Sequence, residues 1–137
     1  MIRLAVHMAL SLVLMGQAGA AQGAAKDNDE VLTLPSGLEA RFHEMIWDEP
    51  GQGLVYRFRF VARAFTQDMA FDILMADLEH LCTSYAIPHL ASMGPTPHQV
   101  IISLANEAAE FGQYDPDVTQ VFEAYRIEDG TCIWEVF

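Results

Sequence analysis

Alternation of apolar and polar residues predicts several short strands beyond residue 30. The clearest is the segment 54–64, in which every second residue from Leu54 onward is apolar. Such alternation is typical of a strand with one buried face, because successive side chains point to opposite sides of the sheet. The opposite face of this strand carries Arg57, Arg59 and Arg63.

A hairpin is predicted just before this strand, at residues 31–43. A Pro-Ser-Gly turn at residues 35–37 separates two short runs, which is a common signal for paired strands. In the second run Leu38, Ala40 and Phe42 alternate with polar residues and are expected to face the core. The residues that then face the other way are Glu39, Arg41 and His43.

From Asp68 onward the apolar positions recur at steps of three and four, which predicts a helix with one buried stripe. We expect this helix to end at Ile87-Pro88, because the residue before a proline disfavours helical backbone. The residues of the stripe are Phe71, Leu74, Met75, Leu78, Leu81, Cys82 and Tyr85.

Two further elements are predicted in the segment that follows the helix. The apolar run 99–105 has the length of a strand buried on both faces. The sequence Asp115-Pro116-Asp117 offers a cap, a first-turn proline and an acidic residue, which together predict a short helix reaching toward Phe122.

The last segment, 124–137, has Asp129-Gly130 at its middle and predicts a two-residue hairpin. Pairing about this turn sets Ile127 opposite Cys132 and points Cys132 into the core. The fold expected from these elements is α+β, with a single domain at residues 31–137. Its antiparallel sheet has about five or six strands and one main helix packed on one face.

The first residues resemble a cleavable secretory signal. A basic start at Arg3 is followed by an apolar stretch and then by small residues up to Ala20, the order found in such signals. We expect cleavage after residue 20 and a polar leader at residues 21–30. The mature protein is then periplasmic or secreted, and it is not membrane-embedded after signal cleavage.

Export gives the two cysteines a structural interpretation. Cys82 and Cys132 are the only cysteines of the chain, and both are predicted to face the core from elements that pack together. Because exported proteins retain disulfides, we predict a Cys82–Cys132 bridge rather than a redox site, which usually has a C-x-x-C pair.

The chain is strongly acidic, with 19 Asp and Glu against 7 Lys and Arg and a formal net charge of −12. This balance disfavours nucleic acid and anionic membrane surfaces as partners and leaves a basic or envelope protein, a cation or a neutral ligand as partners. It also serves solubility in an exported protein.

Arg57, Arg59 and Arg63 are the predicted binding residues, because alternate strand positions place their guanidinium groups side by side. A carboxylate, a phosphate or an acidic partner would fit such a row. The alternative is that the three arginines pair across the sheet with Glu39, Glu128 or Glu135.

Catalytic chemistry is not indicated. Asp77, His80 and Ser84 share one arc of the predicted helix, but no glycine-rich turn near Ser84 offers an oxyanion site. We interpret the three as a solvated or half-exposed helix flank. The histidines lack metal-ligand spacing, and no nucleotide-binding or nucleophile motif is present. The sequence therefore predicts no catalytic residues, no metal site and no cofactor.

Four segments carry a resemblance to known proteins: 54–60 (LVYRFRF), 99–104 (QVIISL), 110–112 (EFG) and 121–135 (VFEAYRIEDGTCIWE). In these the chain resembles a family of short exported alphaproteobacterial proteins of unknown function. Members sometimes carry the label acetolactate synthase. A chain this short and exported cannot build the site for a thiamine cofactor that lies between large domains, so the label is not taken literally.

Two hypotheses for function follow. The first is a non-enzymatic exported domain that binds a protein or another envelope component. The second is a small-ligand binder or minor hydrolase that uses the arginine-bearing strand face.

Overall fold

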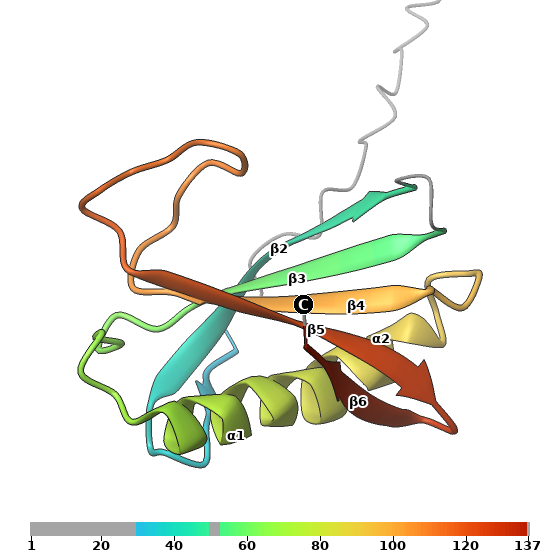
Figure 1. Ribbon diagram of the computed structural model, residues 1–137, viewed down its shortest axis with the longest axis horizontal. Coiled ribbons are helices and arrows are strands. Elements are labelled where there is room, and N and C mark those ends of the chain that lie inside the picture. The colour runs from blue at the N-terminus through green and yellow to red at the C-terminus, as the bar shows by residue number, and fades with distance from the viewer. Residues whose placement is uncertain (1–29, 50–52, 137) are drawn as a thin grey trace, which may run out of the picture.

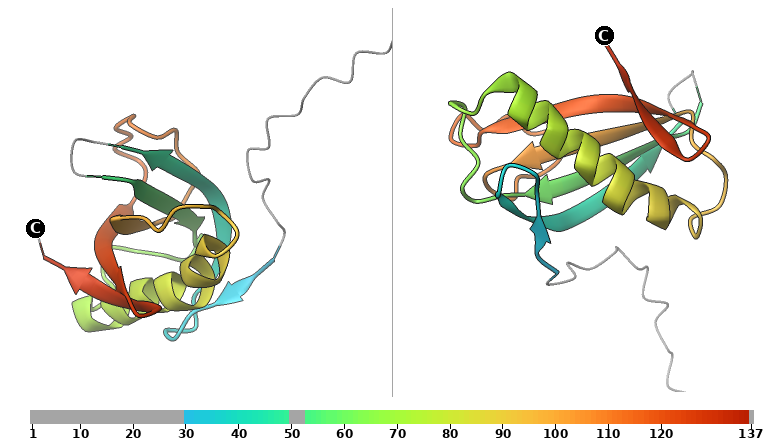
Figure 2. Two further views of the ribbon diagram at one scale, coloured as in Figure 1. Left: turned by 90° about the vertical axis from the view of Figure 1, so that its right-hand side faces the viewer. Right: turned by 90° about the horizontal axis from the view of Figure 1, so that it is seen from below.

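The computed structural model describes residues 30–49 and 53–136. The predicted signal at residues 1–20, and the leader up to residue 29, lie outside the described residues. Six strands form one sheet in chain order, from β1 to β6 (Figure 1). One long helical segment covers one face of this sheet, which we call the inner face; the opposite one is the outer face (Figure 2).

Strands form in each segment for which the sequence predicts one, although β5 begins at Gln120, before the predicted start at residue 124, and the α+β class is confirmed. Their bounds are β1 Leu32–Thr33, β2 Glu39–Asp48, β3 Val55–Val61, β4 Gln99–Ala105, β5 Gln120–Glu128 and β6 Thr131–Glu135. The first hairpin is confirmed by the pairing of β1 with β2. The last is confirmed by the pair Ile127 and Cys132 across the Asp129-Gly130 turn. Both turn residues have positive φ, as a tight hairpin of this type requires.

The sheet is antiparallel except at one pair of strands. Strands β3 and β4 run parallel, with Val55 beside Gln99 and Val61 beside Ala105. The reason is the connection between them. The helical segment carries the chain back to the edge of the sheet at which β3 begins, and β4 starts from that same edge. The helix thereby lies across the inner face.

The core lies between the inner face and the helix. Aromatic side chains from β2 and β3 meet Tyr85 of the helix, with ring centroids 5.1 Å apart for Phe42 and 5.2 Å apart for Phe60. Phe58 and Phe60 are 2% and 1% exposed, and burying each such side chain contributes about 2 kcal/mol. The alternation predicted for residues 54–64 is therefore the pattern that builds the core.

The helical segment continues beyond the predicted end. Helix α1 spans Phe71–Leu81, the π-helical turn η1 spans Cys82–Ala86, and α2 spans Ile87–Leu90. The prediction that Ile87-Pro88 ends the helix is wrong. A proline ring clashes with the carbonyl four residues earlier in an α-helix, but here the Ile87 N–H donates to the Cys82 carbonyl, five residues back. This wider turn accommodates Pro88.

A second local prediction is also wrong, because residues 115–119 form a turn instead of a short helix. The Asp115 carboxylate accepts a hydrogen bond of 2.9 Å from the Asp117 N–H, and the Val118 N–H donates to the Asp115 carbonyl at 3.2 Å. Aspartate caps a turn as readily as a helix. Strand β5 begins immediately afterwards, so no room remains for a helix.

The predicted disulfide joins Cys82 and Cys132. Cys82 is fully buried and Cys132 is 4% exposed, as their inward orientation on the helix and the hairpin predicts. The bridge ties the last hairpin to the middle of the helical segment, across 50 residues of chain.

Candidate functional site

All five arginines of the described residues lie on the outer face of the sheet. On β2, Ala40 and Phe42 belong to the inner core, so the intervening Arg41 points outward. The same alternation turns Arg57 and Arg59 of β3 outward, together with Arg63, which follows β3. On β5, Ala124 packs with the outer-face residues Val55 and Ile101, so Arg126 also lies outside.

Arg59 is almost entirely buried, with 5% of its surface exposed. Its guanidinium forms an ion pair with Glu44 on the neighbouring strand β2. It also donates a hydrogen bond of 2.8 Å to the carbonyl of Ala109, in the loop between β4 and β5. Because its two terminal nitrogens bind Glu44 of β2 and the Ala109 carbonyl, Arg59 fastens that loop to the sheet.

Arg57 lies beside Arg59 and is also engaged by the chain. Its Nε lies 3.8 Å from an Asp48 carboxylate oxygen, a distance of electrostatic attraction rather than of hydrogen bonding. The ring of Phe111 covers both guanidinium groups, 5.5 Å from that of Arg57 and 5.7 Å from that of Arg59. Such cation–π contacts contribute about 0.5–2 kcal/mol each.

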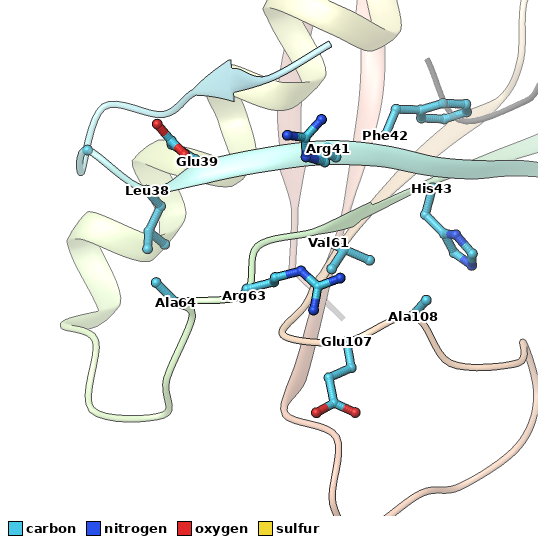
Figure 3. A pocket seen from close by; sticks show the side chains of 11 residues that line it. Leu38, Glu39, Arg41, Phe42, His43, Val61, Arg63, Ala64, Glu107 and Ala108 are labelled. Carbon is cyan, nitrogen blue, oxygen red and sulfur yellow. The ribbon is translucent and has the colours of Figure 1, made fainter. Parts of the chain in front are cut away.

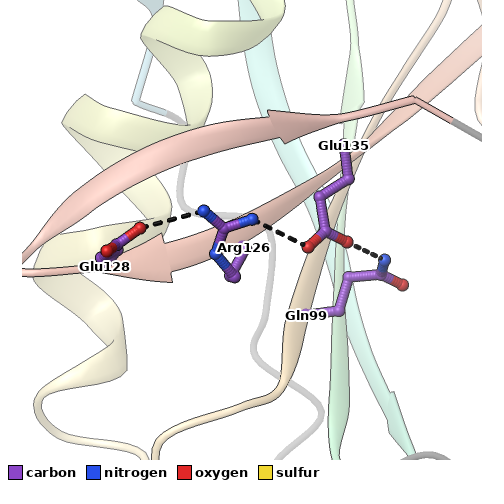
Figure 4. A network of polar contacts seen from close by, with 4 residues as sticks. All are labelled: Gln99, Arg126, Glu128 and Glu135. Atoms are coloured by element: carbon purple, nitrogen blue, oxygen red, sulfur yellow. Dashed lines mark hydrogen bonds and ion pairs between the residues drawn. The ribbon is translucent and has the colours of Figure 1, made fainter.

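The partners of these arginines differ from those considered in the alternative reading. Glu44 and Asp48 take the place of Glu39, Glu128 and Glu135, because the neighbour of β3 on this side is β2. Glu128 and Glu135 instead accept hydrogen bonds from Arg126, at 2.9 Å and 3.5 Å. Gln99 extends this network through a 2.8 Å bond to Glu135 (Figure 4). The bond to Glu128, followed by that to Glu135, raises the pKa of Arg126.

Arg63 has a different environment. It is exposed and lines a groove of about 840 Å³ between the start of β2, the end of β3 and the start of the β4–β5 loop. Among the described residues, no carboxylate lies within ion-pair distance of it. Figure 3 shows the side chains that line the groove, which are Gly37, Leu38, Glu39, Arg41, Phe42, His43, Val61, Arg63, Ala64, Glu107 and Ala108.

An irregularity in β2 helps to build this groove. The register between β2 and β3 shifts between Phe42 and Glu44, which inserts His43 as an extra residue. A bulge of this kind re-aims the side chains beside it. Glu44 consequently reaches Arg59, while His43 lines the groove beside Arg41.

The turn at one end of the groove is held by a buried carboxylate. Asp77 of α1 is fully buried, and it accepts hydrogen bonds from the N–H of Ser36 at 2.9 Å and from its hydroxyl at 2.5 Å. The next residue, Gly37, has φ of 91° and lines the groove. The core-facing helix therefore fixes the position of the groove wall.

The predicted flank of Asp77, His80 and Ser84 is only partly correct. His80 and Ser84 lie on the outside of the helix, with Nδ1 of His80 3.3 Å from the Ser84 hydroxyl. For Asp77 the prediction of a solvated or half-exposed flank is wrong. The turn at Ser36 covers this residue and buries it completely. Its carboxylate binds that turn, so the three residues do not form a relay.

Residues 30–49 and 53–136 contain neither a candidate metal site nor a candidate membrane-spanning helix. Their His, Cys, Asp and Glu side chains form no group that could hold a metal ion. None of their helices is long and apolar enough to cross a membrane.

Comparison with known proteins gives one match. Residues 12–137 match the model of a family described as "Family of unknown function (DUF6497)". The chain belongs to this family. Family membership confirms the resemblance to a family of unknown function and assigns no activity. No curated protein and no solved structure matches the chain.

Four titratable residues of the groove were not among the predicted binding residues: Glu39, Arg41, His43 and Glu107. Arg41 and His43 were expected to face away from the core, but only the β2–β3 register brings them next to Arg63. Glu107 comes from a loop that carries no pattern. The alternation of residues 39–43 was the available signal for Arg41 and His43, because it turns them away from the core. It locates them at the groove only when the pairing of β2 with β3 is known.

Proposed function

We propose that this domain is a non-enzymatic binding module that holds an anionic group in the outer-face groove. The observation that carries the proposal is Arg63, an exposed guanidinium in a concave site with no ion-pair partner among the described residues. Guanidinium groups bind carboxylates and phosphates through paired hydrogen bonds. The groove volume lies within the range of small-ligand sites.

The three predicted arginines take different roles in this proposal. Arg63 contacts the ligand, and Arg41 of β2 adds positive charge to the same groove. Arg57 and Arg59 hold the β4–β5 loop over the sheet through Phe111 and the Ala109 carbonyl. The start of that loop forms one wall of the groove. In this proposal Arg57 and Arg59 therefore position that wall and do not contact the ligand.

The location we propose is the periplasm or the exterior of the cell. The secretory pattern of residues 1–20 and the strongly acidic composition support this location. The Cys82–Cys132 bridge supports it as well, since disulfides persist in oxidising compartments. The groove would then meet ligands of the cell envelope or the medium.

Calorimetric titration with a panel of small carboxylates and inorganic phosphate tests the proposal. Wild-type protein is expected to bind at least one member, and Arg63→Gln is expected to weaken that binding about tenfold, the effect of losing roughly 1.4 kcal/mol. Arg126→Gln is the matched control, because Arg126 lies on the same face and does not line the groove. Equal affinity of Arg63→Gln and wild type would refute the proposal.

A second candidate function is recognition of a basic envelope protein. The described arginines all lie on the outer face, so the helix on the inner face has no arginine to balance its acids. Helix α1 carries Asp72 and Glu79 on its exposed side and no Lys or Arg. This acidic surface favours a basic partner. Reversing both charges with Asp72→Lys and Glu79→Lys should abolish any salt-sensitive complex recovered from periplasmic extract. A complex that survives this reversal would exclude the acidic helix as the docking surface.

A further inference from the structure

The groove carries charges of both signs. Arg41 and Arg63 contribute two guanidinium groups, and Glu39 and Glu107 contribute two carboxylates. In Figure 3, Arg63 lies between β2 and Glu107, so the two charges come from separate segments that face the same space. The site therefore offers partners for an anion and for a cation within one concavity.

Arg63 and Glu107 do not neutralise each other. Within the part of the chain that the structure describes, neither has an ion-pair partner within 4 Å, and both side chains are exposed. Other acidic groups near the outer face are engaged, since Glu44 pairs with Arg59 and Glu135 with Arg126. Among the described residues, the groove thus presents one charge of each sign without an ion-pair partner.

This arrangement discriminates between classes of ligand. A dianion would gain from the arginines but would be repelled by Glu39 and Glu107, and a simple cation would meet the opposite balance. A ligand with one charge of each sign gains at both ends, since a guanidinium binds its carboxylate bidentately and a carboxylate accepts from its ammonium group. Repulsion of the wrong partner is as much a source of specificity as attraction.

The remaining walls of the groove define the body of the ligand. Leu38, Val61, Ala64 and Ala108 contribute apolar surface, and two of the four are alanines, which leave space for an aliphatic group. A ligand with an apolar body between an ammonium and a carboxylate has the chemistry of an amino acid or a short peptide.

We infer that the groove binds a zwitterion of this class, a free amino acid or a short peptide with unblocked ends, with its carboxylate on Arg63 and its ammonium group on Glu107. This inference rests on the proposed function of the groove and narrows its ligand. The two sources share one chemistry and differ in the separation of their charges.

Blocked and unblocked ligands test the inference. Leucine, N-acetyl-leucine and leucinamide form one series, and alanyl-leucine with the same two modifications forms the other. We expect an unblocked compound in at least one series to bind about fivefold more tightly than either blocked form, the effect of one partly exposed ion pair. Preference for leucine would identify a free amino acid, and preference for alanyl-leucine a peptide.

Variants separate the two charges. Glu107→Gln should weaken binding of the unblocked ligand about fivefold and should not weaken binding of the N-acetyl form, which has no ammonium group for Glu107, whereas Arg63→Gln should weaken binding of both. Arg126→Gln should change neither. If N-acetyl and unblocked forms bind equally and Arg63→Gln weakens both, the zwitterion inference is overturned and the anion site stands. If no compound of either series binds at millimolar concentration, the zwitterion inference fails, while the carboxylate and phosphate panel decides the proposed function separately.

Discussion

Removal of the Asp77 carboxylate tests how the helix fixes the groove. In Asp77→Ala the N–H and hydroxyl of Ser36 lose their acceptor. A hydrogen bond to a charged group contributes about 1.5–3 kcal/mol. Because Ser36 is exposed, its freed groups regain bonds to water, and alanine favours the helix by about 0.6 kcal/mol. For two such bonds, less the helix gain, we therefore expect a loss of about 2–5 kcal/mol in the free energy of unfolding.

Urea unfolding followed by tryptophan fluorescence measures this loss. Asp72→Ala is the matched control, because Asp72 lies exposed on the same helix and should change stability by less than about 0.5 kcal/mol. Ser36→Ala removes the hydroxyl that donates to Asp77 and accepts at 3.2 Å from the Leu38 N–H, and it should cost about 1.5 kcal/mol. In the double variant the two effects should fall short of their sum by about 1 kcal/mol, the coupling expected of groups in contact.

A local measurement distinguishes loss of the turn from general weakening. The Gly37 N–H donates to the Leu34 carbonyl within the turn, at 2.8 Å. Its hydrogen exchange should accelerate in Asp77→Ala more than that of the sheet amides in β4. Strict additivity with Ser36→Ala, or unchanged exchange at Gly37, would refute the coupling between α1 and the groove wall.

Three further predictions follow from the structure. Replacing both cysteines, Cys82→Ala with Cys132→Ala, should cost about 4 kcal/mol from the closure entropy of the loop, as measured by urea unfolding; a loss below about 1 kcal/mol would contradict a structural role. Burial, followed by the charges of Glu123 and Glu79, raises the pKa of Tyr125, so stability is fully present below the unfolded-state value of about 10 and declines as the pH rises above it. Unfolding at pH 9 and 11 should show this decline, and Tyr125→Phe should reduce it; an equal decline in both proteins would contradict the assignment. Phe111→Ala should loosen the β4–β5 loop and raise its cleavage rate in limited proteolysis about fivefold, while Tyr114→Ala, at a residue 92% exposed, should leave the rate unchanged; equal rates would show that Phe111 does not hold the loop.

Local patterns accounted for most of the strands. Alternation in residues 54–64 and the turn at Asp129-Gly130 determine β3 and the last hairpin, and the hairpin register places Cys132 in the core. These features depend on neighbours in the sequence, so the sequence alone could predict them. The disulfide followed because both cysteines face inward from their own elements.

Features that depend on distant segments could not be predicted in the same way. The parallel pairing of β3 and β4 depends on the course of the helical connection. Pro88 remains in the helical segment because a π turn forms before it, and no residue pattern indicates that turn. Asp77 is buried because a hairpin turn 41 residues away covers it.

In the candidate site, too, some features of single side chains follow from the local sequence and others depend on distant segments. Alternation turns Arg57, Arg59 and Arg63 to the outer face, and to that extent the sequence predicted their positions. It could not predict that the β4–β5 loop folds back over Arg57 and Arg59.

That fold-back gives the three arginines different chemistry. Desolvation makes an unpaired guanidinium costly, so the buried Arg59 must take its partners from the chain itself, and it does so with Glu44 and Ala109. Arg63 lies beyond the end of β3 and is exposed, so the solvent can stabilise its charge without a partner from the chain. The arginine best suited to bind a ligand is therefore the one that the fold leaves exposed. A row of like side chains in a sequence is weaker evidence for a binding site than the degree to which each of those side chains is buried.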